Sequence, residues 1–243
     1  MRHYAQQCAQ LIQDAYSIVV LTGAGISTSA GIPDFRGPQG LYVTRRYDPD
    51  KVFDIQAFRA NSKPFYDFAR DFLTLNSNIQ PTLAHYFLHK LENLGKLSGI
   101  ITQNIDSLHQ RAGSKKVLEI HGSFWKSHCL NCKKEFSFEE MKQKIQEETI
   151  ARCSCKGVIK PDVVFFGENV KYLDQCICLI EESDLLFVIG SSCVVQPAAS
   201  LPFYAKGKIV IINLDKVDLL FKNIEFQVNC DIDSFFREVE DFL

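Results

Sequence analysis

Short apolar runs rich in β-branched side chains place the strongest constraint on how this 243-residue chain folds. Each run has the length of a strand that is buried on both faces of a parallel sheet. Amphipathic stretches of helical length lie between some of the runs, and this alternation predicts an α/β fold with a doubly wound parallel sheet. The predicted strands cover residues 17–22, 99–102, 117–120, 185–189 and 208–212.

Four amphipathic stretches are predicted to be helices. In the first of them, Cys8, Leu11, Ile12 and Ala15 recur at the spacing that places apolar side chains on one helical face. The predicted helices cover residues 6–16, 84–94, 171–181 and 234–242.

Small or polar residues follow all of the predicted strands. In open α/β sheets, ligands bind outside the carboxyl ends of the strands, so these residues predict one shared ligand site. A plain loop remains an alternative at any single end, but it explains all of the ends together less well. The segments are Thr22-Gly23-Ala24-Gly25-Ile26-Ser27, Gln103-Asn104-Ile105-Asp106, His121-Gly122, Gly190-Ser191-Ser192 and Asn213-Leu214-Asp215.

The turn with Gly23 and Gly25 follows a strand and precedes a predicted helix. Glycine lets the backbone approach a phosphate, and the N–H groups at a helix start favour anions. Thr28 replaces the third glycine of the dinucleotide fingerprint, and no acidic residue stands at the ribose-binding spacing, so a hydride-transfer dehydrogenase is not supported. A tight turn without a ligand remains the alternative. The following Asp34-Phe35-Arg36 would suit a loop that closes over a ligand.

Two close cysteine pairs, Cys129 with Cys132 and Cys153 with Cys155, have a separation that resembles a zinc ribbon. Four thiolates leave zinc no open position, so such an ion would be structural. Buried thiols or a redox pair are the alternatives. Residues 133–150 between the pairs are strongly charged, which predicts that they build little core and depend on the metal for cohesion.

The remaining cysteines, the net charge of −2 and the N-terminal sequence predict a protein of the cytoplasm. The first residues lack the apolar centre of a signal peptide, and the apolar runs are too short to cross a membrane. The absence of a cationic excess gives no indication of nucleic-acid binding. The remaining cysteines are predicted to be unpaired packing residues, as expected where thiols stay reduced. They are Cys8, Cys176, Cys178, Cys193 and Cys230.

Taken together, the motifs resemble those of the sirtuins, the NAD-dependent protein-lysine deacylases, and the overall pattern resembles the bacterial type. The resemblance runs in order from about residue 5 to the end of the sequence. The segments that carry it are Gly23-Ala24-Gly25-Ile26-Ser27, Gly31-Ile32-Pro33-Asp34-Phe35-Arg36-Gly37, Thr102-Gln103-Asn104-Ile105-Asp106-Ser107-Leu108-His109, His121-Gly122, the four cysteines, Lys160-Pro161-Asp162-Val163-Val164-Phe165-Phe166-Gly167-Glu168 and Gly190-Ser191-Ser192.

The resemblance implies a Rossmann-like NAD-binding domain formed by residues 1–39, 82–123 and 161–243. A smaller domain would be made of two insertions: a helical module at residues 40–81 and a zinc-binding module at residues 124–160. One structural Zn²⁺ would be held by Cys129, Cys132, Cys153 and Cys155.

The resemblance also implies which residues bind NAD as a co-substrate. The turn residues Gly23, Ala24 and Gly25, with Thr28 and Arg36, would hold the pyrophosphate and the adjacent ribose, and Asp34 would also bind the cofactor. Phe35 would cover the nicotinamide site. Gln103 and Asn104 would bind the nicotinamide ribose, and Ile105 and Asp106 the carboxamide. The adenosine half would be surrounded by Gly190, Ser191, Ser192, Asn213, Leu214, Cys230 and Asp231.

The implied reaction transfers the acetyl group of a lysine to ADP-ribose and releases free lysine, nicotinamide and O-acetyl-ADP-ribose. His121 would be the general base toward the ribose hydroxyls, because the pKa of histidine lies near neutral pH. Asn104 would be a second catalytic residue. On sequence position alone, a buried structural role for His121 is an equal alternative. Two other functions remain open: an NADase or mono-ADP-ribosyltransferase on the same fold, and a non-catalytic NAD-binding module.

The substrate implied by the resemblance is an acetyl-lysine-containing protein. Val163 and Phe165 would line the tunnel for the acyl-lysine stem, while Gly167, Glu168 and Val194 would clamp the peptide backbone by strand addition. Members that remove succinyl or malonyl groups carry Tyr-x-x-Arg in the helical insertion, but here Ala69 occupies the arginine position and Arg70 follows it. One residue rotates a helical side chain by about 100°. We therefore predict a preference for acetyl or short aliphatic groups and, from the compact chain, a monomer.

Overall fold

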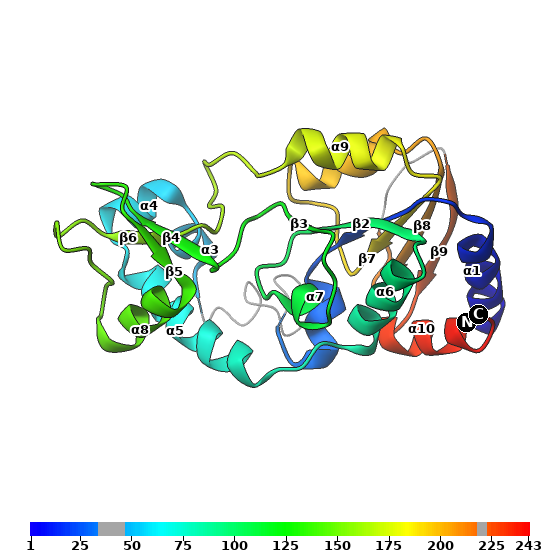
Figure 1. Cartoon of the computed structure of the whole chain (residues 1–243), viewed down its shortest axis with the longest axis horizontal. Helices are drawn as coiled ribbons and strands as arrows, with labels where there is room; N and C mark the ends of the chain where they lie inside the picture. The colour runs from blue at the N-terminus through cyan, green and yellow to red at the C-terminus, as the bar shows by residue number, and fades with distance from the viewer. Residues whose placement is uncertain (34–46, 218–222) are drawn as a thin grey trace. The chain divides into compact units, whose positions relative to one another are not determined.

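The computed structural model describes residues 1–33, 47–217 and 223–243 (Figure 1). These residues form two compact units, each built from separate stretches of the chain. The first unit contains Met1–Gly31, Gln80–Ile120 and Tyr172–Leu243. The second contains Ile32–Ile79 and His121–Lys171. Among the described residues, no helix combines the length and the apolar character that crossing a membrane requires.

A six-stranded parallel sheet in the order β3-β2-β1-β7-β8-β9 forms the centre of the first unit. The chain moves outward from β1 through β2 to β3, and then returns to the other side of β1 to build β7, β8 and β9. This order confirms the predicted doubly wound, Rossmann-like sheet and places its switch point between β1 and β7. The strands are β1 (Ile18–Thr22), β2 (Leu97–Thr102), β3 (Val117–Glu119), β7 (Leu185–Ile189), β8 (Lys208–Asn213) and β9 (Ile224–Asn229).

The strands at the centre of this sheet are buried on both faces. Every residue of β1 and of β7 is buried, and Val20 pairs with Phe187, which pairs in turn with Val210. Two covered faces explain why these strands are continuous apolar runs without polar alternation.

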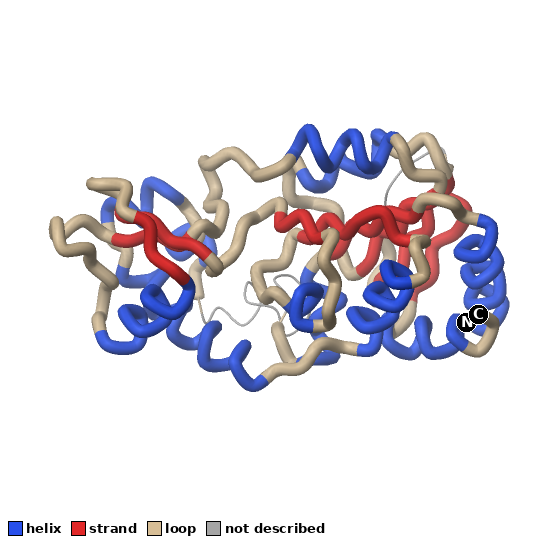
Figure 2. The backbone as a smooth tube through the Cα atoms, in the orientation of Figure 1, coloured by secondary structure: helices blue, strands red, loops and turns tan. Residues whose placement is uncertain are grey.

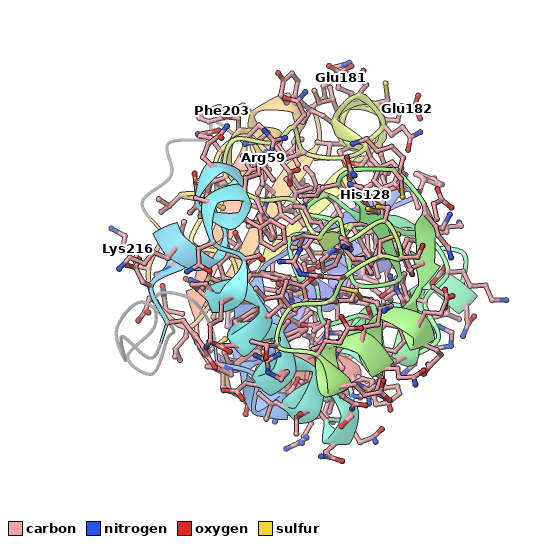
Figure 3. The ribbon with its side chains drawn as sticks, turned by 90° about the vertical axis from the view of Figure 1, so that its left-hand side faces the viewer. Arg59, His128, Glu181, Glu182, Phe203 and Lys216 are labelled. Atoms are coloured by element: carbon pink, nitrogen blue, oxygen red, sulfur yellow. The ribbon has the colours of Figure 1, made fainter. Side chains whose placement is uncertain are left out.

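Helices cover both faces of the sheet (Figures 1 and 2). On one face lie α1 (Arg2–Asp14), α6 (Leu83–Asn93) and α10 (Ile232–Glu240), whose buried side chains share one core with the strands. On the other face lie α9 (Leu173–Glu181) and the 3₁₀ helix η2 (Ala198–Tyr204). Phe203 of η2 projects away from the ribbon (Figure 3) and is 66% exposed.

Two features of the first unit differ from the sequence prediction. The edge strand β9 was not predicted, because its residues alternate in burial and do not form a continuous apolar run. The segment after β1 is a 3₁₀ helix, η1 (Ala24–Ala30), whereas a regular helix was expected. The short helix α7 (Leu108–Arg111) follows β2.

The second unit combines helices with a small antiparallel sheet of order β5-β4-β6. Its helices are α3 (Pro49–Val52), α4 (Ile55–Ala60), α5 (Lys63–Asn78) and α8 (Phe138–Glu147). Its strands are β4 (Lys126–Cys129), β5 (Glu135–Ser137) and β6 (Ile159–Pro161). Asp54 caps α4 by accepting the N–H groups of Gln56 and Ala57, and Ser137 with Glu140 forms a capping box on α8.

Aromatic side chains form much of the core of this unit. Phe165 lies 5.0 Å from Phe65 and 5.3 Å from Phe58 between ring centroids, and all three rings are buried. Residues 133–150, which were predicted to build little core, contribute the buried side chains of Phe136, Met141 and Ile145. The last two lie four residues apart, so α8 presents them on the same face.

Candidate functional site

Two glycine-containing segments meet at the switch point of the sheet in the first unit. The N–H of Gly23 donates to Ile189 O at 3.0 Å, and the N–H of Gly25 donates to Gly190 O at 2.9 Å. A Cβ on Gly25 would lie 2.7 Å from the Cα of Gly190, and a Cβ on Gly190 would lie 2.4 Å from Ile26 N. Gly190 also has a φ of +62°. The ends of β1 and β7 therefore lie so close together that both positions require glycine.

A buried polar network lies beside this turn. Asn104 Nδ2 donates to Gly23 O at 3.1 Å and to Ser27 Oγ at 3.3 Å. Ser27 Oγ donates to Asp106 Oδ2 at 2.7 Å, while Asp106 Oδ1 accepts the N–H of Leu108 at 2.9 Å. Burial raises the pKa of Asp106, and these hydrogen bonds oppose that shift. The structure thus brings the predicted Asn104 and Asp106 together, joined by Ser27.

Gln103 connects this network to the end of β7. Its Nε2 donates to Ser191 Oγ at 2.9 Å, and the same hydroxyl accepts the N–H of Cys193 at 3.2 Å. Ser191 is buried, whereas Ile105 is half-buried and Ser192 is exposed. Side chains from the ends of β2 and β7 therefore meet at the same edge of the sheet.

The residues predicted on the adenosine side follow β8 and β9. Leu214 is 65% exposed, and Asn213 O accepts the N–H of Cys230 at 2.9 Å. The carboxylate of Asp231 caps α10 by accepting the N–H of Ser234 at 2.8 Å. Burial raises the pKa of the Cys230 thiol to about 11, so this sulfur is not a thiolate at neutral pH.

The remaining predicted residues of the glycine turn are only partly placed. Ala24 is half-buried, and the exposed Thr28 donates its hydroxyl to Gly25 O at 2.9 Å. Asp34, Phe35 and Arg36 lie outside the described residues.

His121, the predicted general base, is the first residue of the second stretch of the second unit and is half-buried. Its carbonyl accepts the N–H of Val164 at 2.7 Å. The next residue, Gly122, has a φ of +69°, and a Cβ there would lie 1.9 Å from Asp162 O. The backbone around His121 is therefore held against residues 162–164 in a conformation that only glycine allows at position 122.

The predicted substrate residues of the second unit differ in exposure. Val163 and Phe165 are buried, while Gly167 and Glu168 are exposed and Gly167 has a φ of +88°. Phe166 forms a parallel bridge with Asp54, so this segment is tied to the start of α4. Val194, in the first unit, is 55% exposed.

Cys129, Cys132, Cys153 and Cys155 form the predicted cluster, with all sulfur atoms within 4.8 Å of one another. The Sγ atoms of Cys129 and Cys155 are 3.5 Å apart, and those of Cys132 and Cys153 are 3.6 Å apart. Tetrahedral thiolate coordination of zinc needs separations of about 3.8 Å, because the Zn–S bond is about 2.3 Å long. The donor set and its spacing therefore fit one structural zinc ion.

Of the other cysteines, Cys8 and Cys176 are buried, and Cys193 and Cys230 are partly buried. The prediction that all of them pack as apolar side chains is wrong for Cys178, which is exposed. Its position on α9 faces solvent, because Cys176 and Ile180 are the residues that this helix buries.

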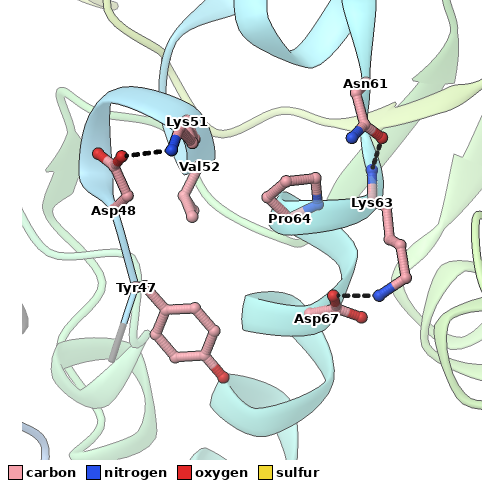
Figure 4. A pocket seen from close by; sticks show the side chains of 8 residues that line it. All are labelled: Tyr47, Asp48, Lys51, Val52, Asn61, Lys63, Pro64 and Asp67. Atoms are coloured by element: carbon pink, nitrogen blue, oxygen red, sulfur yellow. Dashed lines mark hydrogen bonds and ion pairs between the residues drawn. The ribbon is translucent and has the colours of Figure 1, made fainter. Parts of the chain in front are cut away.

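An open pocket in the second unit contains none of the predicted site residues (Figure 4). Its rim carries the ion pairs Lys51–Asp48 at 3.1 Å and Lys63–Asp67 at 2.6 Å. Both pairs are largely solvent-exposed and contribute little to stability. The lining residues are Tyr47, Asp48, Lys51, Val52, Asn61, Lys63, Pro64 and Asp67.

A buried pair of histidines, His85 and His109, lies next to the site. His109 Nε2 lies 3.0 Å from the hydroxyl of Thr22, and His85 Nδ1 accepts the N–H of Thr82 at 3.2 Å. The two ring centroids are 4.6 Å apart. Burial lowers the pKa of His85 to about 3 and that of His109 well below its ordinary value, so both rings are neutral. Sequence spacing gives no signal that these two histidines meet.

The sequence is similar to a known protein family and to named proteins. The model of the Sir2 family matches residues 23–197. A protein of Thermotoga maritima named NAD-dependent protein deacetylase is 43% identical over 236 residues, which cover 94% of each chain.

Solved structures agree with that comparison. A Sir2 structure with a deacetylated peptide and 3′-O-acetyl ADP ribose is 40% identical, with a TM-score of 0.88 and 97% of each chain covered. A Sir2 structure bound to a propionylated peptide is 38% identical, with a TM-score of 0.86 and the same coverage.

We expect the Cys153→Ser substitution to abolish stoichiometric zinc binding, since a hydroxyl is a poor replacement for one of four thiolates. Zinc content after purification, measured by elemental analysis, tests this. Cys178→Ser is the matched control, because Cys178 lies outside the cluster, and it is expected to retain one zinc ion per chain. A Cys153→Ser protein with full zinc content would contradict the assignment.

The neutral histidine pair predicts that stability falls in acid. The unfolded state binds protons near pH 6.5 and the folded His85 only near pH 3, so stability is present above pH 6.5 and is lost as the pH falls toward 3. His85→Gln is expected to reduce the loss between pH 7 and pH 4.5 by about 2–3 kcal/mol, as measured by urea unfolding. The exposed His3 provides the control, His3→Gln, which is expected to leave the loss unchanged. Equal losses in His85→Gln and the wild type would reject this explanation.

Proposed function

The chain belongs to the Sir2 family, and from this premise we propose that it is an NAD-dependent protein-lysine deacetylase. The products are the free lysine, nicotinamide and O-acetyl-ADP-ribose. The observation that carries the proposal is the buried network of Ser27, Asn104 and Asp106 beside the glycine turn at the switch point of the sheet. An α/β sheet binds nucleotides at this position.

NAD fits the first unit because the polar groups there converge at one edge of the sheet. NAD supplies the ADP-ribose that accepts the acyl group and the nicotinamide that leaves. Asn104 and Gln103 are proposed to hold the nicotinamide ribose, and Asp106 with Ile105 the carboxamide. The hydrogen bonds of Asp106 to Ser27 and to the Leu108 N–H keep its carboxylate in one orientation. A preorganised polar group of this kind loses little orientational freedom when its ligand binds.

His121 is the proposed general base toward a ribose hydroxyl. Its backbone is fixed by the hydrogen bond from the Val164 N–H and by the glycine that follows. A fixed backbone matters because proton transfer requires the imidazole nitrogen within hydrogen-bond reach of the hydroxyl. The zinc site takes no part in these steps, since four thiolates leave the ion without an open position.

The second unit is proposed to bind the acyl-lysine side chain along Val163 and Phe165 and the peptide backbone at Gly167 and Glu168. Val194 of the first unit is proposed as a further substrate-binding residue. Backbone pairing selects little between side chains, so we expect broad sequence tolerance among acetylated proteins.

A four-thiolate metal site favours a reducing compartment, which supports the proposed cytoplasmic location.

The contacts of α5 support the proposed preference for acetyl or short aliphatic acyl groups. Ala69 is fully buried, and Tyr66 donates its hydroxyl to the carbonyl of Ile159. The guanidinium of Arg70 donates to Glu148 O at 3.1 Å and to Thr149 O at 3.2 Å and pairs with Asp67. The guanidinium of Arg70 is thus hydrogen-bonded to the backbone that follows α8. We propose that it does not bind the carboxylate of an acyl group.

Incubation with NAD and an acetyl-lysine peptide tests the main proposal. Nicotinamide and O-acetyl-ADP-ribose are expected in equal amounts and only with the acetylated peptide. His121→Ala is expected to lower kcat by about 10²–10⁴-fold, the contribution of a general base, while the exposed control His3→Ala retains the activity. Nicotinamide release without peptide would indicate an NADase instead, and no release would indicate a binding module. Full activity in His121→Ala would reject its role.

For the acyl group, we expect a succinyl-lysine peptide to react at least about tenfold more slowly than the acetyl-lysine peptide. An uncompensated carboxylate in an apolar site costs well over 1.4 kcal/mol, which corresponds to that factor. Arg70→Gln is expected to lower the unfolding free energy by about 1–3 kcal/mol without changing the succinyl-to-acetyl ratio, because Arg70 holds backbone carbonyls. Comparable rates on both peptides, measured by the appearance of deacylated peptide, would refute the predicted preference.

A further inference from the structure

Lys160 has a buried ammonium group, although it belongs neither to the metal cluster nor to the proposed NAD site. Its side chain is only 3% exposed. An unpaired ammonium in such a position is unfavourable by several kcal/mol, so its partners are informative.

All of these partners come from the segment that follows Lys160 in the chain. Nζ donates to Val163 O at 2.7 Å and to Pro161 O at 3.3 Å. It forms an ion pair with Glu168 Oε2 at 2.8 Å and lies 4.1 Å from the centroid of the Phe165 ring. The segment therefore wraps around the charge, with two carbonyls, a carboxylate and an aromatic face directed at it.

Glu168, the ion-pair partner of Lys160, also forms hydrogen bonds with the backbone. Its Oε2 accepts the N–H of Phe165 at 2.9 Å, and its own N–H donates to Phe165 O at 3.0 Å. The chain reverses at Gly167, whose φ of +88° suits the turn. Between these contacts, the Val164 N–H donates to His121 O at 2.7 Å. One ammonium group thus orders a segment that also contacts the backbone of His121.

We propose that Lys160 is a positioning residue for substrate binding: its ammonium fixes the backbone of residues 163–168 and, through Val164, supports His121. Lys160 itself touches no substrate in this proposal. The inference rests on the proposed function, because that function assigns the acyl-lysine wall to Val163 and Phe165 and the peptide clamp to Gly167 and Glu168.

The test compares Lys160→Met, Lys160→Arg and Glu168→Gln with the wild-type protein. Lys144→Met is the matched control, because Lys144 pairs with Glu148 at the same 2.8 Å in the same unit but with exposed fractions of 29% and 36%. The two carboxylates have similar exposure, 32% for Glu168 and 36% for Glu148, so the comparison isolates the burial of the lysine, which is 3% exposed at position 160. A pair whose lysine reaches solvent contributes little. For each variant, KM for the acetyl-lysine peptide, KM for NAD, kcat and zinc content are measured.

Lys160→Met is expected to raise the peptide KM about 10- to 100-fold, since a small displacement of a positioning group has effects of this size. Its KM for NAD is expected to stay within about threefold, and its zinc content to be unchanged. Lys160→Arg keeps the charge and is expected to recover most of the peptide affinity. Glu168→Gln is expected to show an intermediate increase, and Lys144→Met none. A peptide KM within about twofold of the wild type in Lys160→Met would overturn the proposal.

Hydrogen exchange of the backbone amides separates this inference from the proposed function. Residues 163–168 are expected to exchange faster in Lys160→Met, while β4 exchanges as in the wild type. If the wild type proves inactive but this local change occurs, the proposed function fails and the positioning role stands. Unchanged exchange rejects the role. If Lys160→Met does not fold, Glu168→Gln decides through the same exchange measurement, and wild-type exchange of the Phe165 amide in that variant rejects the proposal.

Discussion

The close approach of the Gly25 and Gly190 backbones is the contact on which the first unit's site depends. It joins the ends of β1 and β7, the strands between which the sheet changes direction. A side chain at either position would collide with the opposite backbone. On one side of this contact, Asn104 from the end of β2 reaches Gly23 O, and Gln103 reaches across to the Ser191 hydroxyl after β7. Polar groups from the ends of separate strands thus meet beside this contact at one edge of the sheet.

In both units, a buried ionisable side chain is surrounded by hydrogen-bonding groups from nearby residues. Asp106 receives hydrogen bonds from the Ser27 hydroxyl and the Leu108 N–H, and Lys160 is surrounded by the segment that follows it. In each case the burial of an ionisable group is unfavourable, and the surrounding hydrogen bonds offset that cost while restricting the backbone. Such groups therefore contribute more to the precision of a site than to the stability of the fold.

The sequence predicted what depends on neighbours along the chain. Apolar strand runs gave the parallel sheet, and the spacing of Cys129, Cys132, Cys153 and Cys155 gave the thiolate cluster. Features that need distant partners were missed. The contact of His85 with His109 requires α6 and α7 to be packed together. The edge strand β9 is a different case: its apolar and polar residues alternate as in a half-buried strand, but the strand prediction rested on continuous apolar runs.

The glycine turn is subject to a steric constraint that the sequence prediction did not include. Gly23 and Gly25 were expected to admit a phosphate, but the structure shows an additional steric demand from Gly190 and Ser191, which no local pattern reveals. The same applies to Lys160: its type and position fit a motif, yet its role becomes visible only when the ammonium is seen among Val163 O, Glu168 and Phe165. A motif match therefore identifies the position of a functional residue, while the contacts around that residue determine which physical constraint it satisfies.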